Sequence, residues 1–404
     1  MAKRPLIIPV FLPYLGCRER CLFCNQKAVD ERPPSPFSVQ KFIESSLAKI
    51  KLSNSLSLRG VKRRSNLKKE EIATPACRNA ALRRAGTPYG LAMTYTDNEC
   101  GSISLSNEEA RERQVAFYGG SFTAIHRDDQ IRYLKEVRPF LLSGLIDSLR
   151  ISTRPDALDE DTLSLLKEHG VKTVEIGAQS MIDEVLSLSQ RSHRVEDTIS
   201  ATQRLKQWGF EVGLHLMIGL PGDTYDRFLQ TLDRVIDLKP DFIRIHPTLV
   251  LKGAPLEVLW KDKKYFPLSL KEAIDWLKAG VLRLERASIP VARIGLQPTR
   301  ELERDYLAGP YHPALHHLID SAIFFDIAKY LLQNYPNGSQ AIFLCHPKEV
   351  SNLRGQKNEN ILKLKEQFGL REIFIQSTED VQRGSFILQS PGKEVSIQRK
   401  SFSF

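Results

Sequence analysis

The sequence lacks the features that mark membrane-spanning, secreted and disulfide-stabilised proteins. It contains no run of 18 or more apolar residues, so no transmembrane helix is expected. The first ten residues hold only a short apolar stretch, interrupted by Pro5 and Pro9, which does not suit a signal peptide. Only six of the 404 residues are cysteines, and three of these are clustered, so a disulfide framework is not indicated. These absences predict a cytoplasmic protein with no membrane association.

Charge and order are both unevenly distributed along the chain. Of the net charge of +10, residues 51–100 account for +6, with ten Lys or Arg and four Asp or Glu. The same region shows neither helical nor strand periodicity, which predicts a low-order insertion over residues 52–113. Whether it is a lid or a disordered surface insertion stays open. Because the excess charge lies mostly there, it is weak evidence for a polyanionic partner.

Outside this insertion, predicted strands and helices alternate. The strands fall at residues 6–12, 115–118, 148–153, 173–177, 211–218 and 242–251, and the helices at 128–142, 159–169, 181–188, 195–209 and 225–238. Six such repeats predict an α/β fold with a partial (β/α)6 TIM-like barrel, in which chemistry gathers at the carboxyl ends of the strands. We expect a core with its extension over residues 1–320 and a small α/β domain over 321–404.

The most informative motif is the run of Cys17, Cys21 and Cys24, spaced CxxxCxxC. Thiolates at this spacing can converge from one loop on three corners of a [4Fe–4S] cube, which leaves the fourth iron open to a chelating ligand. A zinc site is the alternative, but it would need a fourth ligand from a second CxxC or HxxxH pair. None is visible near Cys77, Cys100 or His126. The spacing therefore favours a cluster.

This layout resembles the radical S-adenosylmethionine (SAM) superfamily. The resemblance implies that SAM chelates the open iron and is cleaved by one electron to a 5′-deoxyadenosyl radical. Phe23 matches the aromatic position whose backbone lies near the adenine, and Gly119, Gly120 and Ser121 match the loop that holds the methionine amino group.

Further strand ends resemble those of oxygen-independent coproporphyrinogen oxidases and the Elongator catalytic subunit. By that resemblance Ser152 makes a ribose or carboxylate contact, although the coproporphyrinogen enzymes carry an acid there. Gln179 makes a polar SAM contact, Arg191 pairs with the SAM carboxylate, and His215 faces the ribose. From the residues alone, Gln179 and His215 could instead be satisfied polar residues at strand ends, and Arg191 could instead form a surface ion pair.

Residues 244–256 and the pair Leu259-Trp260 are similar to a stretch of the Elongator-like branch. That branch also carries an acetyltransferase domain. About 140 residues follow position 265, and no acetyl-CoA motif is visible in them, so we expect that domain to be lacking.

The tail contains a glycine loop that opens a predicted amphipathic helix, followed by a strand. This order resembles the KH module, whose GxxG loop clamps single-stranded RNA. The matching positions here are Gly355, Gln356, Lys357 and Asn358, with asparagine in place of the second glycine. A plain α/β closing domain is the alternative.

Together these resemblances imply a radical SAM enzyme with a [4Fe–4S] cluster and SAM as cofactors, acting on RNA in tRNA modification. Its partners would be an electron donor such as flavodoxin or ferredoxin, and tRNA or another RNA. Two alternatives stay open. One is the same chemistry on a small molecule such as a porphyrinogen, and the other is a non-catalytic protein that holds a cluster or binds RNA.

Overall fold

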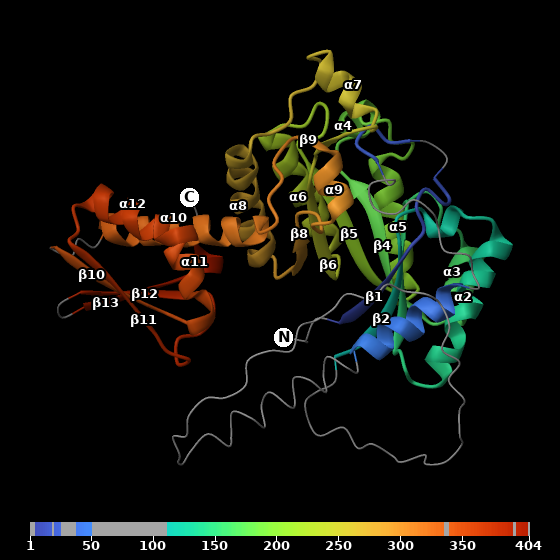
Figure 1. The fold of residues 1–404 in the computed structure, drawn as a ribbon, viewed down its shortest axis with the longest axis horizontal. Coiled ribbons are helices and arrows are strands. Elements are labelled where there is room, and N and C mark those ends of the chain that lie inside the picture. Colours follow the sequence, from blue (N-terminus) through green and yellow to red (C-terminus); the bar gives the residue numbers. More distant parts are fainter. Residues whose placement is uncertain are drawn as a thin grey trace, which may run out of the picture.

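A seven-stranded parallel sheet organises the first three quarters of the protein (Figure 1). The computed structural model describes residues 5–17, 20–25, 38–50, 111–334, 339–390 and 393–402. The sheet has the order β1-β2-β3-β4-β5-β6-β8, and its strands are β1 (Leu6–Phe11), β2 (Arg113–Tyr118), β3 (Ser148–Thr153), β4 (Val171–Gln179), β5 (Glu211–Ile218), β6 (Phe242–Pro247) and β8 (Val291–Ile294). All neighbouring strands run parallel, so their carboxyl ends meet at one edge.

Helices connect the strands and cover the outer face of the sheet (Figure 1). They are α2 (Arg127–Leu142), α3 (Glu160–Glu168), α4 (Asp183–Leu188), α5 (Val195–Gln207), α6 (Tyr225–Leu238) and α8 (Leu270–Arg286), and residues 38–50 form a further helix. Side-chain caps begin several of them: Asp159 accepts a hydrogen bond from the Thr162 amide, and Ser269 forms a capping box with Glu272.

The two faces of the sheet differ in chemistry because side chains alternate along a strand. On β3, Leu149 and Ile151 are fully buried in the core beneath the helices. Arg150 and Ser152 therefore lie on the inner, concave face. The inner face is polar along much of its width, which is where an enclosed site can form.

The predicted partial barrel is confirmed, with two corrections. The segment predicted as one strand over residues 242–251 is two strands, β6 and β7 (Val250–Leu251), because the chain turns at Thr248 and Leu249 and β7 pairs antiparallel with β9 (Tyr306–Ala308). A seventh strand, β8, was not predicted, since only its four residues add to the edge of the sheet. Of the predicted insertion, residues 52–110 lie outside the described residues, and Arg113 already belongs to β2.

A second, four-stranded sheet lies beyond the barrel in the order β11-β10-β12-β13 (Figure 1). Its strands are β10 (Gln340–Cys345), β11 (Glu372–Ser377), β12 (Ser385–Ser390) and β13 (Lys393–Gln398), and its helices are α10 (Leu315–Asn334), α11 (Val350–Arg354) and α12 (Glu359–Phe368). The predicted boundary between residues 320 and 321 falls inside α10, which also packs against α8 of the barrel. The division into domains stays a prediction.

Two short helices, α7 (Leu256–Lys261) and α9 (Arg300–Asp305), lie with β7 and β9 above the carboxyl edge of the large sheet (Figure 1). Leu22 of the cysteine loop packs with Leu256 and Tyr265 in a small apolar cluster, so this layer also holds the loop. Among the residues that the structure describes, no helix is long and apolar enough to cross a membrane.

Candidate functional site at the carboxyl edge of the sheet

The loop that follows β1 places the three cysteines at the carboxyl edge. The Cys17 amide donates to the Tyr14 carbonyl at 3.1 Å, and the Cys24 amide donates to the Cys21 carbonyl at 3.0 Å. Tyr14 and Gly16 have positive φ angles of 57° and 75°, so the backbone reverses before the first cysteine. All three thiols are partly buried and unpaired by disulfides.

The glycine loop after β2 packs directly on the cysteine loop. The Ser121 amide donates to the Leu15 carbonyl at 2.9 Å, and a Cβ on Gly120 would overlap that same carbonyl. A Cβ on Gly16 would overlap the Ser121 carbonyl in return. The glycines thus allow two backbones to approach closely, which is one structural reason for the pair Gly119-Gly120.

Two polar side chains lie against the thiols. Burial raises the pKa of the Cys17 thiol, and hydrogen bonds from Ser121 and the charge of Arg191 oppose that increase. Arg191 donates from Nη1 to the Cys21 Sγ at 3.1 Å and from Nη2 to the Gly177 carbonyl at 2.9 Å. Its Nε is buried and has no hydrogen-bond partner.

The end of β4 is locally strained beside Arg191. Gln179 has a φ angle of 65°, which non-glycine residues rarely adopt, and the β4–β5 register shifts between Ile176 and Gln179. A Cβ on Gly177 would lie 2.8 Å from the Gln179 Nε2 and 3.5 Å from the Arg191 Nη2. The missing side chain at Gly177 therefore lets both polar groups meet over the strand end.

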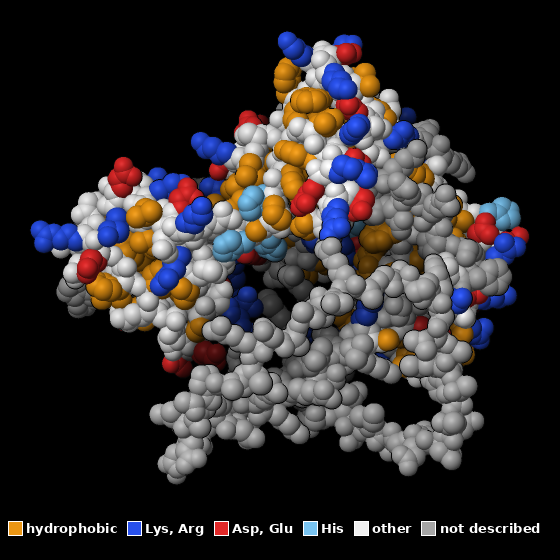
Figure 2. Space-filling view, in the orientation of Figure 1, with side chains coloured by type: hydrophobic (Ala, Val, Ile, Leu, Met, Phe, Trp, Pro, Cys, Tyr) orange, Lys and Arg blue, Asp and Glu red, His pale blue; other side chains and the backbone are white. Residues whose placement is uncertain are grey.

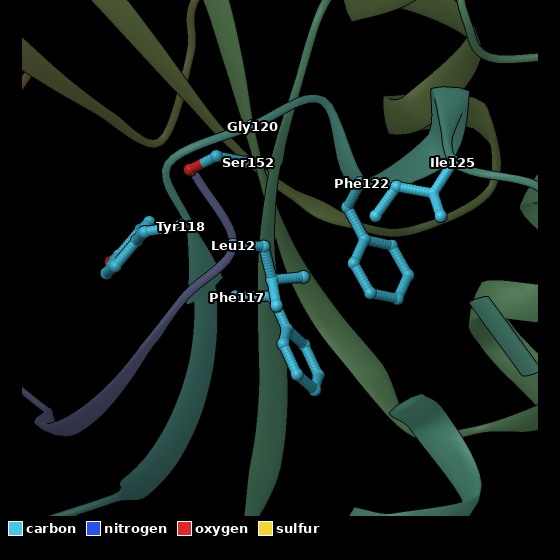
Figure 3. Close-up of a pocket in the computed structure, with 7 residues that line it drawn as sticks. All are labelled: Leu12, Phe117, Tyr118, Gly120, Phe122, Ile125 and Ser152. Atoms are coloured by element: carbon cyan, nitrogen blue, oxygen red, sulfur yellow. The ribbon is translucent and has the colours of Figure 1, made fainter. Parts of the chain in front are cut away.

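Ser152, at the end of β3, lies beneath the glycine loop, and its hydroxyl is buried without a hydrogen-bond partner. It lines a narrow pocket that is too small for a water molecule, drawn in Figure 3 with Leu12, Phe117, Tyr118, Gly120, Phe122 and Ile125. The phenyl rings of Phe117 and Phe122 stack at 5.0 Å. This pocket is a packing gap between the two loops, not a substrate cavity.

A buried ion network occupies the inner face one layer further down. Glu175 of β4 is fully buried and accepts hydrogen bonds from Arg150 at 2.6 Å, Tyr118 at 3.0 Å and Arg244 at 3.1 Å. His215 contacts its second oxygen through Nε2. Burial alone would raise the pKa of Glu175, but His215, Arg244 and Arg150 together hold it well below the usual range.

The donor set of the cysteine loop fits an iron–sulfur cluster. Within the described residues, no group of three or more His, Cys, Asp or Glu side chains converges on a point that could hold a single metal ion. A four-iron cluster does not require such convergence, because each thiolate binds a different iron. Three thiols on one loop and an orphaned buried Nε on Arg191 are therefore consistent with a cluster and a polar ligand beside it.

The structure brings together most of the predicted site residues. Ser121 and Arg191 contact cysteines of the loop, Gln179 lies beside Arg191, and Ser152 lies under Gly120. Phe23 and His215 also have contacts of their own, and their SAM contacts stay predictions. Phe23 packs its ring into the apolar cluster with Leu22 and Trp260, and His215 points into the ion network below the strand ends.

The predicted RNA loop lies in a separate part of the molecule. Gln356, Lys357 and Asn358 are exposed between α11 and α12, far from the cysteine loop (Figure 1). Lys357 and Asn358 have positive φ angles of 50° and 64°, and Gly355 packs closely against Asn360.

Comparison with known proteins gives the family. The model of the "Radical SAM superfamily" matches residues 81–235, and that of the "Radical_SAM C-terminal domain" matches residues 240–324. Together the two matches span more than half of the chain. The chain therefore belongs to the radical SAM superfamily and is an enzyme of that type. The match begins after the cysteine loop, so the three ligands stay a prediction from the motif and its geometry.

Curated relatives cover only part of this chain. It is 39% identical over 131 residues to a "tRNA uridine(34) acetyltransferase" of Methanocaldococcus infernus, which is 32% of this chain and 24% of the relative. It is 31% identical over 139 residues to "Elongator complex protein 3" of Homo sapiens, covering 34% and 25%. "Protein YhcC" of Escherichia coli is 26% identical over 209 residues, covering 48% and 66%. The matches thus span about a quarter of the length of the acetyltransferase and Elongator relatives.

Among solved structures, the Elp3 of Methanocaldococcus infernus aligns with a TM-score of 0.45 and 27% identity, covering 55% of this chain and 54% of the other. Coproporphyrinogen III oxidase (HemN) of Escherichia coli aligns with a TM-score of 0.41 and 18% identity, covering 70% and 53%.

Sequence reasoning missed three arginines of the inner face, which are Arg150, Arg244 and Arg293. The signal was available in part, because Arg150 and Ser152, like Arg244 and His246, alternate with apolar residues along their strands. That period indicates a strand with one polar face. The alternation does not say which arginines share one carboxylate, because that depends on the order of the strands in the sheet.

Proposed function

We propose that this enzyme binds a [4Fe–4S] cluster through Cys17, Cys21 and Cys24 and cleaves SAM to a 5′-deoxyadenosyl radical that acts on RNA. The observation that carries the proposal is the cysteine loop itself, where Ser121 and Arg191 place hydrogen-bond donors against two of the thiols. Such donors stabilise thiolates, the form in which cysteine binds metal. When bound, the cluster supplies the single electron for SAM cleavage.

The surrounding residues would bind and orient SAM. Arg191 offers a guanidinium whose described partners are a sulfur and a carbonyl, so its positive charge is available to a carboxylate. Gln179 adds an amide beside it, and Ser152 adds a buried hydroxyl under the glycine loop. The apolar contacts of Leu22 and Phe23 with the α7 layer would keep water from the loop.

The first experiment is anaerobic reconstitution with iron and sulfide, followed by reduction, addition of SAM and assay of 5′-deoxyadenosine. Wild-type protein should form it, and Cys17→Ala should lose both the cluster absorbance and the product. Cys345→Ala is the matched control, because Cys345 is buried in the second sheet and should not affect either readout. A brown, four-iron Cys17→Ala protein would contradict the ligand assignment.

Exposed lysine side chains beside the cysteine loop support RNA as the substrate. Figure 2 shows Lys and Arg side chains over α7 and α9, with Asp and Glu side chains among them. In the α7 layer, Lys261 pairs with Glu257 and Lys264 with Asp262. The α7 layer supplies Lys252, Lys261, Lys263 and Lys264, and Phe266 is 74% exposed beside them. Lysines that neutralise phosphates, together with an exposed aromatic ring on which a base can stack, are typical of single-stranded RNA contacts. The relatives that are named as tRNA uridine(34) acetyltransferases point to tRNA.

The test of the RNA proposal is the salt dependence of tRNA binding. Replacing Lys261, Lys263 and Lys264 together by Gln should weaken binding and reduce the slope of log K against log salt by about 2 to 3. The double variant Lys135→Gln with Arg138→Gln on α2 removes exposed charge elsewhere and is the control. Equal slopes for wild type and the α7 variant would contradict the assignment of this surface.

The loop Gly355–Asn358 is proposed as a second RNA contact, on the strength of its exposed residues between two helices. Lys357→Glu should weaken RNA binding while 5′-deoxyadenosine formation without RNA stays unchanged. The enzyme also needs a one-electron donor such as flavodoxin or ferredoxin. Replacing the protein donor by dithionite in the same assay separates reduction from RNA binding.

A further inference from the structure

The inner face of the sheet carries more positive than negative charge next to the proposed SAM site. Arg150 of β3 and Arg244 of β6 contact a single carboxylate, Glu175, and Arg293 of β8 lies beside Arg244. Two other acids, Glu112 and Glu211, lie at the opposite end of the strands and pair with Lys172. The carboxyl half of the face therefore has a net positive charge among the described residues.

The charged side chains of this face differ in how far they are exposed to solvent. The Arg150 side chain is 6% exposed and the Glu175 side chain 0%, so this pair is closed to solvent. The Arg244 and His215 side chains retain 14% and 20% exposure, so the β5–β6 side of the network is still accessible. A ligand entering the inner face would meet Arg244 before Glu175.

Arg293 is the cation without a carboxylate. It lies opposite Arg244 in the β6–β8 register, and its side chain donates to the Gly295 carbonyl at 3.2 Å and to the Gln297 Oε1 at 2.6 Å. Within the described chain, no acid pairs with it. Burial and the neighbouring charge of Arg244 both lower the pKa of Arg293, which is the expected result for a cation that lacks a counter-charge.

His246 completes the group. It lies two residues beyond Arg244 on the same face of β6, with its ring centroid 5.8 Å from that of His215. Its Nε2 is buried and has no hydrogen-bond partner. Arg293, Arg244 and His246 thus present two guanidinium groups and an unused imidazole nitrogen from adjacent strands.

We infer that Arg293, Arg244 and His246 form a binding site for an oxyanion group of the substrate, either a phosphate or a carboxylate. Two guanidinium groups can hold several oxygens of such a group with charge-assisted hydrogen bonds. An oxyanion also supplies the negative charge that Glu175 alone cannot provide to three arginines. The inference deepens the proposed function, because a phosphate here would fix a nucleotide of the RNA below the SAM site.

Titration with small anions tests the inference without turnover. Inorganic phosphate and uridine 5′-monophosphate should bind the wild-type protein, measured by isothermal calorimetry at low salt. Arg293→Gln should weaken that binding roughly 10- to 100-fold, as expected for loss of a charged hydrogen bond, and Arg293→Lys should restore part of it. Arg283→Gln, which removes a surface cation paired with Asp233, is the control and should bind as wild type does.

Two further arms identify the source of the anion. If acetate binds in an Arg293-dependent way and phosphate does not, the site takes a carboxylate, and a phosphate preference assigns it to a nucleotide. Equal binding of all anions to wild type and Arg293→Gln would overturn the inference. A wild-type protein that binds phosphate but forms no 5′-deoxyadenosine would contradict the proposed function and leave this site standing. Thermal midpoints of both Arg293 variants near that of wild type show that binding is being compared between folded proteins.

Discussion

Two buried glutamates, one in the barrel sheet and one in the short 3-10 helix that follows β10, have opposite electrostatic environments. Glu175 in the barrel is surrounded by Arg150, Arg244 and His215, which hold its pKa well below the usual range. Glu349, beyond the carboxyl end of β10, accepts hydrogen bonds at both carboxylate oxygens from the Gly384 amide, and burial raises its pKa. The first carboxylate is kept charged by cations, and the second is disfavoured as an anion.

The difference indicates what each sheet is built for. Burying charge has a large desolvation cost, and replacing an ion pair by apolar residues is often neutral or stabilising, so a buried network is weak evidence for stability alone. The barrel retains such a network on the face that adjoins the cysteine loop. The second sheet instead buries aromatic residues such as Phe343 and Phe386, stacked at 5.0 Å, on the face toward its helices.

Glu175→Gln should have the largest effect. Removing the charge leaves Arg150 and Arg244 buried without a counter-ion, so the free energy of unfolding should fall by about 3 to 5 kcal/mol. Chemical denaturation of both proteins measures it. Glu184→Gln, which removes an exposed carboxylate paired with Arg227, is the matched control and should change stability by less than about 1 kcal/mol. Similar losses of stability for the two variants would show that the buried network contributes no more than an exposed ion pair.

The barrel should also be the acid-sensitive part. Burial, followed by the charge of Arg191, lowers the pKa of His193 to about 4, and its Nε2 contacts the Ala178 carbonyl. A histidine whose pKa is lowered by folding stabilises the protein above its unfolded value near 6.5, and that stability is lost as the pH falls toward 4.

From pH 7 to pH 5, wild type should therefore lose about 2 kcal/mol more than His193→Gln. Denaturation at several pH values gives the slope. His126→Gln, on an exposed side chain, should keep the wild-type slope. If His193→Gln also retains it, the imidazole is not held neutral by the fold.

Glu349→Gln should have a much smaller effect than Glu175→Gln. Because folding raises the pKa of Glu349, the folded state binds its proton more tightly, and the stability that this carboxyl contributes is lost as the pH rises above the unfolded value near 4.3. The neutral amide avoids that loss, so the variant should be within about 1 kcal/mol of wild type at pH 7, or more stable. A loss as large as that of Glu175→Gln would remove the contrast between the sheets.

The smallest effect is expected on the open face of the second sheet. Phe374 of β11 is 44% exposed, so Phe374→Ser should change the free energy of unfolding by no more than about 0.5 kcal/mol. Phe343 of the neighbouring strand is fully buried, and Phe343→Ala should cost about 3 to 5 kcal/mol. Equal losses would show that the outer face is covered in the folded protein.

Local sequence determined most of the barrel. The predicted strands at 148–153 and 211–218 and the helix at 225–238 coincide with β3, β5 and α6, because their apolar period and capping residues are local signals. β8 was missed since four residues carry little periodicity, and the strand forms only because β6 offers an edge. The turn between β6 and β7 was missed because apolar residues continue through it.

The candidate site also has a part that local sequence indicates and a part that depends on tertiary packing. The CxxxCxxC spacing singled out the three thiols as candidate ligands before any fold was known, since residues on one loop need no tertiary contact to come close. Arg191 and Ser121 were predicted as SAM contacts only through resemblance. It is the packing of β2, β4 and the loop that brings them to the sulfurs.

By itself, the sequence determined the class of fold, the parallel direction of the strands and the thiol cluster, because each depends on residues close together in the chain. Only the tertiary structure decided that Glu175 contacts Arg150, Arg244 and His215 at once. It also decided that Arg293 has no acidic partner among the described residues. These side chains come from five different strands, β3, β4, β5, β6 and β8. Their pairing is set by strand order and register, because hydrogen bonding between neighbouring strands brings together side chains that lie far apart in the sequence.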